Sequence, residues 1–241
     1  MEQEIKQVFV NGVGVYPFRS FDQAVDYITE HKGALLAVGT AKIVYDKHIH
    51  PLINRNVGYC DGSGPVMALH QKGYKEAVKI AGCELWLKLI ERHQHDFTFY
   101  LVGAKREVIE ETVEKLKQDY PAISILGYRD GYLKEGDKEL LIKDIEEKKP
   151  DVVFVAMGSP EQEILIEEMQ KHHSAIYMGL GGSFNVYTNH VERAPQWWID
   201  HNLEAIYRVI KEPQRLKRRR HGCLITFAWW LISGKFKRER N

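Results

Sequence analysis

One carboxylate in this chain stands where a general base could work. Asp61 directly follows an apolar run that reads as a strand, Val57–Cys60, and precedes the glycine-bearing turn Gly62-Ser63-Gly64. An aspartate in such a turn can cap the next helix. It can also take a proton from a reacting hydroxyl, if partial burial raises its pKa towards the working pH. The spacing alone leaves both roles open.

A second candidate follows the apolar run at residues 152–156. Ser159 is a good N-cap, Pro160 suits the first helical position, and Gln162 can close a capping box. A helix start of this kind presents free backbone N–H groups and a positive dipole end to an anion such as a diphosphate. Helix capping by itself explains the same residues, so both interpretations stay open.

Glycines mark the ends of three predicted strands. Because glycine has no side chain, its backbone can approach a ligand closely or adopt a positive φ. The spacing matches neither a Walker loop nor a dinucleotide fingerprint, yet three such strand ends together favour a nucleotide-type pocket. These glycines are Gly103, Gly158 and the series Gly179, Gly181 and Gly182, with Asn185 three residues further on.

No Asp-x-Asp pair occurs in the chain, so the charge on a leaving diphosphate would be met by cations and backbone N–H groups. His48 and His50, His93 and His95, and His172 and His173 form close pairs that lack a completing ligand, and we expect no metal site. The cations available for the diphosphate are Lys79, Arg208, Arg215 and Arg218.

The elements that must position these residues alternate along the chain. Continuous apolar runs are typical of strands buried on both faces, and the amphipathic stretches between them predict helices. We therefore predict an α/β fold with a Rossmann-like, mainly parallel sheet and helices on both faces. Ligands then bind at the carboxyl ends of the strands. The predicted strands are 34–38, 77–81, 97–102, 123–126, 152–156 and 175–179, and the clearest helices are 21–30, 107–118 and 138–148.

The chain changes character near Pro195, where helical patterns continue without strands. We predict a Rossmann-like core at residues 1–194 and a helical, basic extension at 195–241. Residues 211–241 hold ten Lys or Arg and two Glu, a net charge of +8 in a chain whose net charge is +1. This asymmetry indicates an anionic partner surface or ligand.

The apolar patch at residues 224–232 is short. Its nine residues are far fewer than the roughly 20 needed to span a bilayer. Trp229 and Trp230, flanked by basic residues, suit the headgroup boundary of a membrane. Two alternatives stay open: a helix that packs both Trp side chains on the core, and a nucleic-acid-binding tail.

The first residues and the cysteines indicate the compartment of the protein. The first residues lack the basic and apolar pattern of a secretory signal, which predicts a cytoplasmic protein. Cys60, Cys83 and Cys223 are too far apart for a disulfide framework or a zinc site.

An ordered series of motifs runs through the chain. The motifs are Cys60-Asp-Gly-Ser-Gly64, Ile80-Ala-Gly-Cys-Glu-Leu85, Phe99-Tyr-Leu-Val-Gly103, Gly127-Tyr-Arg-Asp-Gly-Tyr132, Met157-Gly-Ser-Pro-Glu-Gln-Glu163, Gly179-Leu-Gly-Gly-Ser-Phe184, Arg193-Ala-Pro195, Leu203-Glu-Ala-Ile-Tyr-Arg208 and Glu212-Pro-Gln-Arg215. With these motifs the chain resembles the WecG/TagA/CpsF family of bacterial glycosyltransferases over residues 10–220. Because so many motifs occur in one order, the resemblance is specific.

The resemblance implies an inverting glycosyltransferase without a cofactor. The enzyme would move N-acetylmannosaminuronic acid, or a related N-acetylhexosamine, from a UDP-sugar to undecaprenyl-diphosphate-linked N-acetylglucosamine. It would do so on the inner face of the cytoplasmic membrane, in synthesis of a surface polysaccharide such as enterobacterial common antigen. One alternative is an N-acetylmannosaminyltransferase of the teichoic acid type. Another is a catalytically weak protein that binds a UDP-sugar or a lipid carrier.

The partners follow from the same resemblance. We expect an anionic membrane surface to be contacted through residues 213–241, and self-association with an open number of subunits. We expect no nucleic acid partner.

The resemblance also assigns roles to residues. The family's proposed general base falls on Asp61, and a glutamine associated with the substrate site falls on Gln162. The family's arginines on the C-terminal extension fall on Arg208, Arg215 and Arg218, which would close over the active site and neutralise the UDP diphosphate. The other expected substrate-binding residues are Lys79, Gly103, Asp130, Gly181, Gly182 and Asn185.

Three positions depart from the family pattern. Asn185 stands where the family usually has Asp, and Gly39-Thr40 stands where it usually has Asn. Lys79 replaces the usual Arg, which keeps the charge but loses the bidentate fork. These changes leave open a different donor, a different acceptor or reduced activity.

Overall fold

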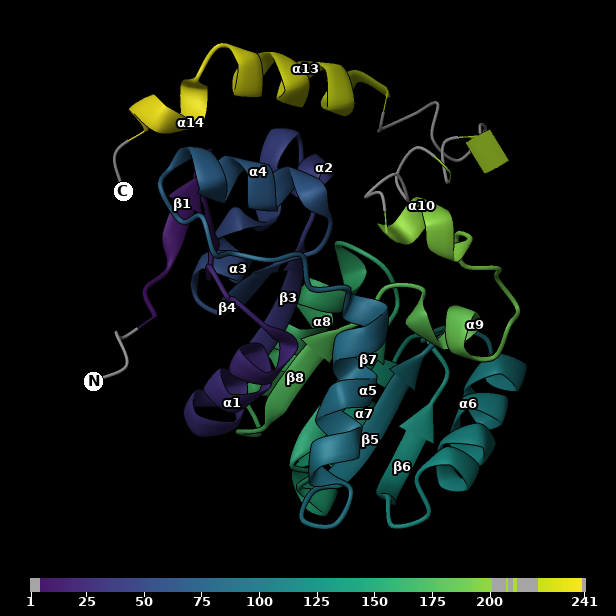
Figure 1. Ribbon diagram of the computed structural model, residues 1–241. Helices are drawn as coiled ribbons and strands as arrows, with labels where there is room; N and C mark the ends of the chain where they lie inside the picture. The colour runs from purple at the N-terminus through teal and green to yellow at the C-terminus, as the bar shows by residue number, and fades with distance from the viewer. Residues whose placement is uncertain (1–4, 201–206, 208–209, 212–220, 240–241) are drawn as a thin grey trace. The chain divides into compact units, whose positions relative to one another are not determined.

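Figure 1 shows the computed structural model, which describes residues 5–200, 207, 210–211 and 221–239. Contacts within the chain divide it into two compact units. Unit 1 comprises Met1–Ser20, Ala37–Ala81 and Arg193–Asn241, and unit 2 comprises Phe21–Leu36 and Gly82–Glu192.

The central feature of the fold is a six-stranded sheet with the order β4-β3-β8-β7-β5-β6. The pairs β3–β8, β8–β7, β7–β5 and β5–β6 are all parallel. The predicted α/β class with a mainly parallel sheet is therefore confirmed. The strands are β3 (Gly33–Val38), β4 (Val57–Cys60), β5 (Thr98–Gly103), β6 (Ser124–Arg129), β7 (Val152–Ala156) and β8 (Ile176–Gly179).

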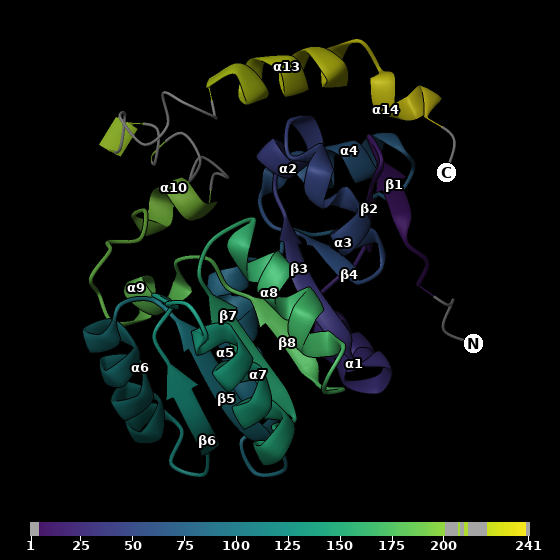
Figure 2. The same ribbon diagram turned by 180° about the vertical axis from the view of Figure 1, so that it is seen from behind.

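Helices cover both faces of the sheet in unit 2. Helices α1, α5 and α6 lie on one face, and α7 and α8 lie on the other (Figures 1 and 2). The fully buried Trp86 of α5 contacts the rings of Phe154 and Phe184 at centroid distances of 5.5 Å, which joins helix, strand and loop in one core. The bounds are α1 (Phe21–His31), α5 (Gly82–His93), α6 (Arg106–Asp119), α7 (Asp137–Lys148), α8 (Glu161–Gln170) and α9 (Ser183–Tyr187).

Unit 1 combines the chain's first and last segments. An antiparallel hairpin of β1 (Val8–Val10) and β2 (Val13–Val15) packs with short helices, and the C-terminal helix α13 packs on α2 and α4. The helices are α2 (Thr40–Val44), the 3₁₀ turn η1 (Lys47–Ile49), α3 (His50–Asn54), α4 (Ser63–Gln71), α10 (Gln196–Asp200), α13 (His221–Ile232) and α14 (Lys235–Arg238).

The strand predicted at residues 77–81 is wrong. This segment has no regular secondary structure, and its backbone makes single hydrogen bonds instead of a ladder. The N–H of Ile80 donates to the Cys60 carbonyl at 2.8 Å, and the N–H of Val78 donates to the Phe18 carbonyl at 3.0 Å. Ala77, Ile80 and Ala81 are buried whereas Val78 is exposed, so the run is a partly buried coil that its apolar pattern could not distinguish from a strand.

Candidate active site

Asp61 lies in the loop between β4 and α4, and its side chain is exposed. Its N–H donates to the Val38 carbonyl of β3 at 3.1 Å, and the preceding Cys60 carbonyl accepts the N–H of Ile80. Gly62, the next residue, has φ +104°, a conformation that favours glycine. The loop backbone is therefore fixed while the carboxylate faces solvent, and the partial burial considered for a general base is not seen here.

The residue before Asp61 is a buried cysteine. Burial, and to a smaller extent the neighbouring Asp61 charge, raises the pKa of the Cys60 thiol to about 12. A thiol with such a pKa stays protonated at neutral pH and is a poor nucleophile. Cys60 therefore serves as a small apolar core residue under the Asp61 loop.

Lys79 is half-buried beside this loop, one residue before Ile80. Its Nζ donates to the Ile199 carbonyl of α10 at 3.5 Å, the long end of the hydrogen-bond range. Two other cations, Lys42 and Arg129, make shorter contacts than Lys79 does. The Lys42 ammonium donates to the Ala37 carbonyl at 2.7 Å, and Arg129 in unit 2 forms an ion pair with Asp137 at 2.7 Å.

The strand ends of unit 2 are joined by backbone hydrogen bonds. The N–H of Ala104 donates to the Ala156 carbonyl at 3.0 Å, and the N–H of Gly131 donates to the Ala104 carbonyl at 2.9 Å. A Cβ at Gly103, which has φ +130°, would lie 2.3 Å from the Ala156 oxygen. Gly103 is thus required by the close approach of β7.

The Gln162 side chain has a different hydrogen-bond partner from the one that helix capping predicts. Helix α8 begins at Glu161 with Pro160 as its N-cap, so the predictions of Ser159 as N-cap and Pro160 as first helical residue are wrong. The Gln162 side chain is 4% exposed, and its Oε1 accepts the N–H of Gly181 at 2.8 Å instead of closing a capping box. Gln162 therefore ties the start of α8 to the glycine loop after β8.

Glu163 is a buried carboxylate that sequence reasoning missed. It is 1% exposed, and its Oε1 accepts a hydrogen bond from Gln162 Nε2 at 3.2 Å. In the sequence, Glu161-Gln162-Glu163 resembles an ordinary solvated helix start. The adjacent apolar residues at 164–166 gave no signal that two of these polar side chains point inwards.

The glycine loop after β8 is open on one side. Among the described residues, a Cβ added at Gly181 or Gly182 would meet no atom within 4 Å, whereas one at Gly179 would lie 2.7 Å from Gln162 Nε2. Asn185, in the short helix that follows, makes no side-chain hydrogen bond within the described part of the chain. The backbone here has room for a ligand and an amide available to bind it.

The remaining predicted residues have separate outcomes. Asp130, in the loop after β6, accepts the N–H of Tyr132 at 2.9 Å through Oδ1 and so shapes its own turn. Arg208, Arg215 and Arg218 lie outside the described residues. Among residues 5–200 and the described C-terminal segments, there is no group of three or more His, Cys, Asp or Glu side chains that could hold a metal ion.

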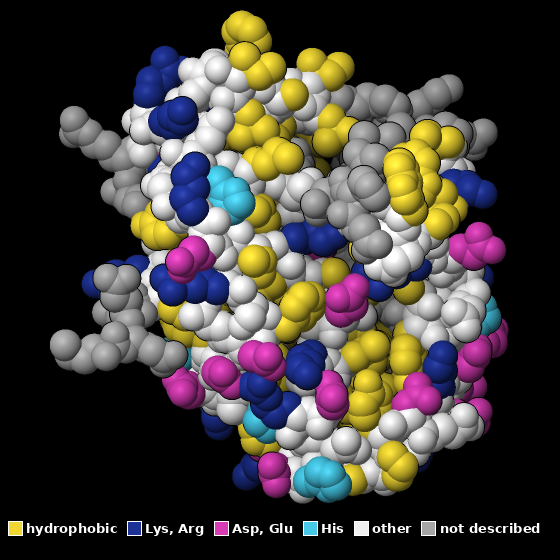
Figure 3. All heavy atoms as spheres, in the orientation of Figure 1, with side chains coloured by type: hydrophobic (Ala, Val, Ile, Leu, Met, Phe, Trp, Pro, Cys, Tyr) yellow, Lys and Arg dark blue, Asp and Glu magenta, His cyan; other side chains and the backbone are white. Residues whose placement is uncertain are grey.

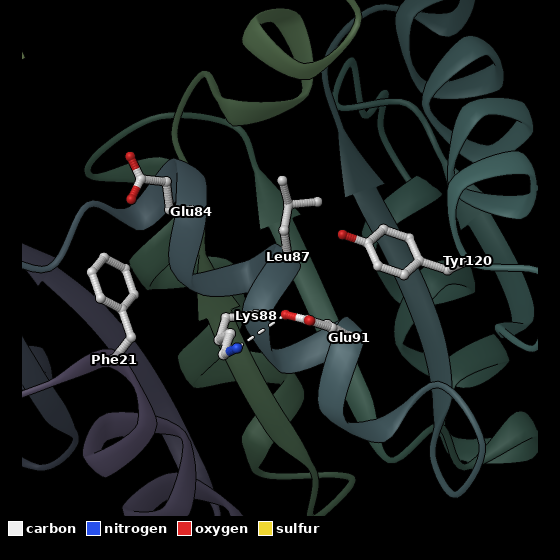
Figure 4. A pocket seen from close by; sticks show the side chains of 6 residues that line it. All are labelled: Phe21, Glu84, Leu87, Lys88, Glu91 and Tyr120. Carbon is white, nitrogen blue, oxygen red and sulfur yellow. Dashed lines mark hydrogen bonds and ion pairs between the residues drawn. The ribbon is translucent and has the colours of Figure 1, made fainter. Parts of the chain in front are cut away.

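Figure 4 shows a shallow hollow of about 390 Å³ in unit 2 that contains none of the predicted site residues. It follows the outer surface of α5, and Lys88 and Glu91 form an ion pair at its edge at 3.1 Å. Because it lies along a helix and away from the strand ends, it is not part of the candidate site. Its lining residues are Phe21, Glu84, Leu87, Lys88, Glu91 and Tyr120.

Helix α13 is apolar on two opposite faces. Cys223 and Phe227 are 2% and 4% exposed, whereas Ile225, Trp229 and Ile232 are 74%, 66% and 81% exposed. Hydrophobic side chains gather along this helix in the space-filling view, with Lys and Arg beside them over α14 (Figure 3). None of the described helices is long and apolar enough to cross a membrane.

The parallel sheet with glycine-bearing strand ends places the chain among Rossmann-like α/β proteins, in which ligands bind at the carboxyl ends of the strands. The comparison with protein families makes the class specific. The model described as the glycosyl transferase WecG/TagA/CpsF family matches residues 10–241. The chain belongs to this family and is a glycosyltransferase, with a sugar donor and an acceptor as its partners.

Proposed function

We propose that this glycosyltransferase moves N-acetylmannosaminuronic acid, or a related N-acetylhexosamine, from a UDP-sugar to undecaprenyl-diphosphate-linked N-acetylglucosamine. The product would enter the synthesis of a surface polysaccharide of the enterobacterial common antigen type. The observation that carries the proposal is the exposed Asp61 on a backbone fixed by Val38 and Ile80, in a chain matched by the family over residues 10–241.

In the proposed reaction, Asp61 acts as the general base. Its carboxylate takes the proton from an acceptor sugar hydroxyl while that oxygen attacks the anomeric carbon of the donor. The new C–O bond forms on the face opposite the bond to UDP, which breaks, so the anomeric configuration inverts and UDP leaves with the bonding electrons. A fixed backbone with a solvent-facing carboxylate suits this role, because the acceptor must reach the base and the base must keep its position.

The donor is proposed to bind the strand ends of unit 2. The open backbone of Gly181 and Gly182 and the available amide of Asn185 support this assignment. Gln162 and Gly103 contribute by shaping the loops, and Asp130 by shaping the turn after β6. We further propose that Arg208, Arg215 and Arg218 neutralise the diphosphate.

A uronic acid donor needs a cation near its carboxylate, and the candidates in this chain are Lys79, Lys42 and Arg129. Lys42 is 9% exposed with its ammonium on a carbonyl, and Arg129 is paired with Asp137. Lys79 is more accessible, and its one hydrogen bond within the described part of the chain is 3.5 Å long. We therefore assign the sugar carboxylate to Lys79.

A transfer assay followed by mass spectrometry tests the proposal. The acceptor is a lipid-diphosphate-N-acetylglucosamine, and UDP-N-acetylmannosaminuronic acid and UDP-N-acetylmannosamine are offered in parallel. Product from the uronic acid donor, lost selectively in Lys79→Met, is the expected result. Product from UDP-N-acetylmannosamine alone would support the teichoic acid type instead. No product from either donor would contradict the proposed reaction.

The membrane contact is proposed to use the outer face of α13 together with the basic residues of 213–241, on the inner face of the cytoplasmic membrane. The exposed Ile225, Trp229 and Ile232 supply apolar side chains, and the exposed Lys237 and Arg238 lie in the adjacent α14. A nucleic acid partner is not proposed, because an apolar exposed face does not suit a phosphate backbone.

Liposome flotation tests this contact. Deletion of residues 213–241 would also remove the buried Phe227 and Phe236, so point substitutions are preferable. Trp229→Ser should reduce binding to anionic vesicles, while Leu140→Ser, at a side chain that is 61% exposed on α7, should not. Equal binding by both variants would contradict the assignment to α13.

The proposal has two further parts. The chain is divided into a core at residues 1–194 and an extension at 195–241, and it self-associates.

A further inference from the structure

Helix α13 contacts the first turn of the helix that follows Asp61. Gly64 lies in that turn, three residues after Asp61. A Cβ added at Gly64 would lie 2.2 Å from Thr40 Oγ1 and 3.4 Å from Phe227 Cε1. The ring of Phe227 and the hydroxyl of Thr40 therefore enclose the start of α4 from two elements that are distant in the sequence.

Phe227 is itself firmly held. It is 4% exposed, and its ring lies 5.3 Å from that of the fully buried Phe236 in α14. Helix α14 is fastened at its first residue to the hairpin and at its C-cap, Glu239, to the C-cap of α4. Lys235 Nζ donates to Asn11 Oδ1 at 2.6 Å, and Lys72 Nζ donates to the Glu239 carbonyl at 2.9 Å. The inner face of α13 is thus fixed on unit 1 independently of its exposed face.

We propose that Phe227 is a positioning residue for Asp61: it holds the first turn of α4, and through that turn it holds the loop that carries the carboxylate. The inference rests on the proposed function, in which Asp61 is the base. The Asp61 loop has backbone restraints from Val38 on one side and Ile80 on the other, and Phe227 supplies a third restraint at the start of the helix.

The expected consequence is kinetic. A displacement of a reacting group by about 1 Å can cost about 10²-fold in rate, so partial release of the α4 turn should lower kcat by at least about tenfold. Donor binding does not depend on the position of Asp61, so the KM for the UDP-sugar should stay within about twofold.

The experiment uses the full chain, a water-soluble acceptor analogue and no membrane. It compares Phe227→Ala with Leu140→Ala, at an exposed side chain of α7 outside the proposed site and the membrane-binding face. Turnover is expressed per UDP-sugar binding site measured by titration, so any unfolded fraction is removed from the comparison. Phe227→Ala should lose at least about tenfold in kcat. Phe227→Leu should recover most of the loss, and Leu140→Ala should match the unchanged protein.

Normal kcat per binding site in Phe227→Ala would overturn the inference. If Phe227→Ala does not fold, the milder Phe227→Leu and Phe227→Val decide, because a graded fall in kcat at constant KM is expected and an unchanged kcat in both would overturn it. Asp61→Asn is measured in the same assay. Its loss of turnover beside normal Phe227 variants would reject the positioning role alone, whereas its normal turnover would reject the proposed base.

Discussion

The segments that follow β4 and β7 both carry polar residues, Asp61 in the loop after β4 and Gln162 and Glu163 in the first turn of α8, but they treat them in opposite ways. After β4, Asp61 has an exposed side chain on a backbone held by a hydrogen bond to Val38. After β7, the side chains of Gln162 and Glu163 are buried and bonded to each other, and Gln162 also holds the N–H of Gly181. The first arrangement keeps a reagent accessible, and the second uses polar groups to brace a loop.

The physical reason lies in the cost of burial. A buried amide or carboxylate destabilises a fold unless hydrogen bonds compensate for the lost water, so such groups become fixed parts of the structure. An exposed carboxylate has no such cost and remains able to accept a proton from a bound hydroxyl. The comparison therefore separates residues whose loss should affect chemistry from residues whose loss should affect stability.

The largest expected effect is on kcat, when the exposed Asp61 is changed. Asp61→Asn should lower kcat by about 10²–10⁴-fold, because the amide cannot take the acceptor proton. The free energy of unfolding should stay within about 0.5 kcal/mol of the original, since the side chain is exposed. Transfer kinetics and urea unfolding measure the two quantities, and UDP-sugar titration should show unchanged affinity. Near-normal turnover of Asp61→Asn would contradict the view that Asp61 serves chemistry while Gln162 serves stability.

A smaller effect, on the free energy of unfolding, is expected when the buried Gln162 is changed. Gln162→Ala should lower the free energy of unfolding by about 2–3 kcal/mol, because the N–H of Gly181 and the carboxylate of Glu163 lose a partner. Urea unfolding checks this, with Glu161→Ala as the control because Glu161 is exposed in the same helical turn. Equal stability of both variants would show that Gln162 is not a brace.

The smallest effect concerns the core beneath Asp61. Because the pKa of Cys60 is raised to about 12, its thiolate fraction at pH 8 should be about 10³-fold below that of an ordinary thiol. Iodoacetamide should therefore modify the half-buried Cys83 in the native protein while sparing Cys60, as mass spectrometry of peptides can show. Rapid native modification of Cys60 would mean that the Asp61 loop opens.

The raised pKa of Cys60 also makes the stability of the fold depend on pH. The unfolded chain releases the Cys60 proton near its ordinary pKa of 9.0, whereas the folded protein retains it up to about 12. The folded state thus binds more protons over this range, and this group's contribution to stability falls as the pH rises from 9.0 towards 12. Cys60→Ala should lose part of that alkaline slope.

The fold was readable in the sequence because continuous apolar runs such as residues 152–156 indicate strands buried on both faces. Residues 77–81 misled for the same reason: burial alone does not make a ladder. The brace formed by Gln162 joins residues 19 positions apart and depends on how two loops meet, which no local pattern encodes. Capping rules therefore gave Gln162 the wrong partner.

The tail shows a similar limit. Three interpretations of residues 224–232 competed: membrane contact, core packing and nucleic-acid binding. The structure shows core contact on one face of α13 and exposure on the other. The sequence hid this division because nearly all residues of the helix are apolar, so no periodic contrast marks the buried side. The contact between Phe227 and Gly64 likewise depends on tertiary structure.

The pH dependence of kcat tests the central claim most directly. With a saturating UDP-sugar and a water-soluble acceptor, kcat of the unchanged protein should fall at low pH as the Asp61 carboxylate becomes protonated. The account predicts that the residual activity of Asp61→Asn lacks this acid limb, while Gln162→Ala retains it. An acid limb that persists unchanged in Asp61→Asn would contradict the account, because another group would then be the base.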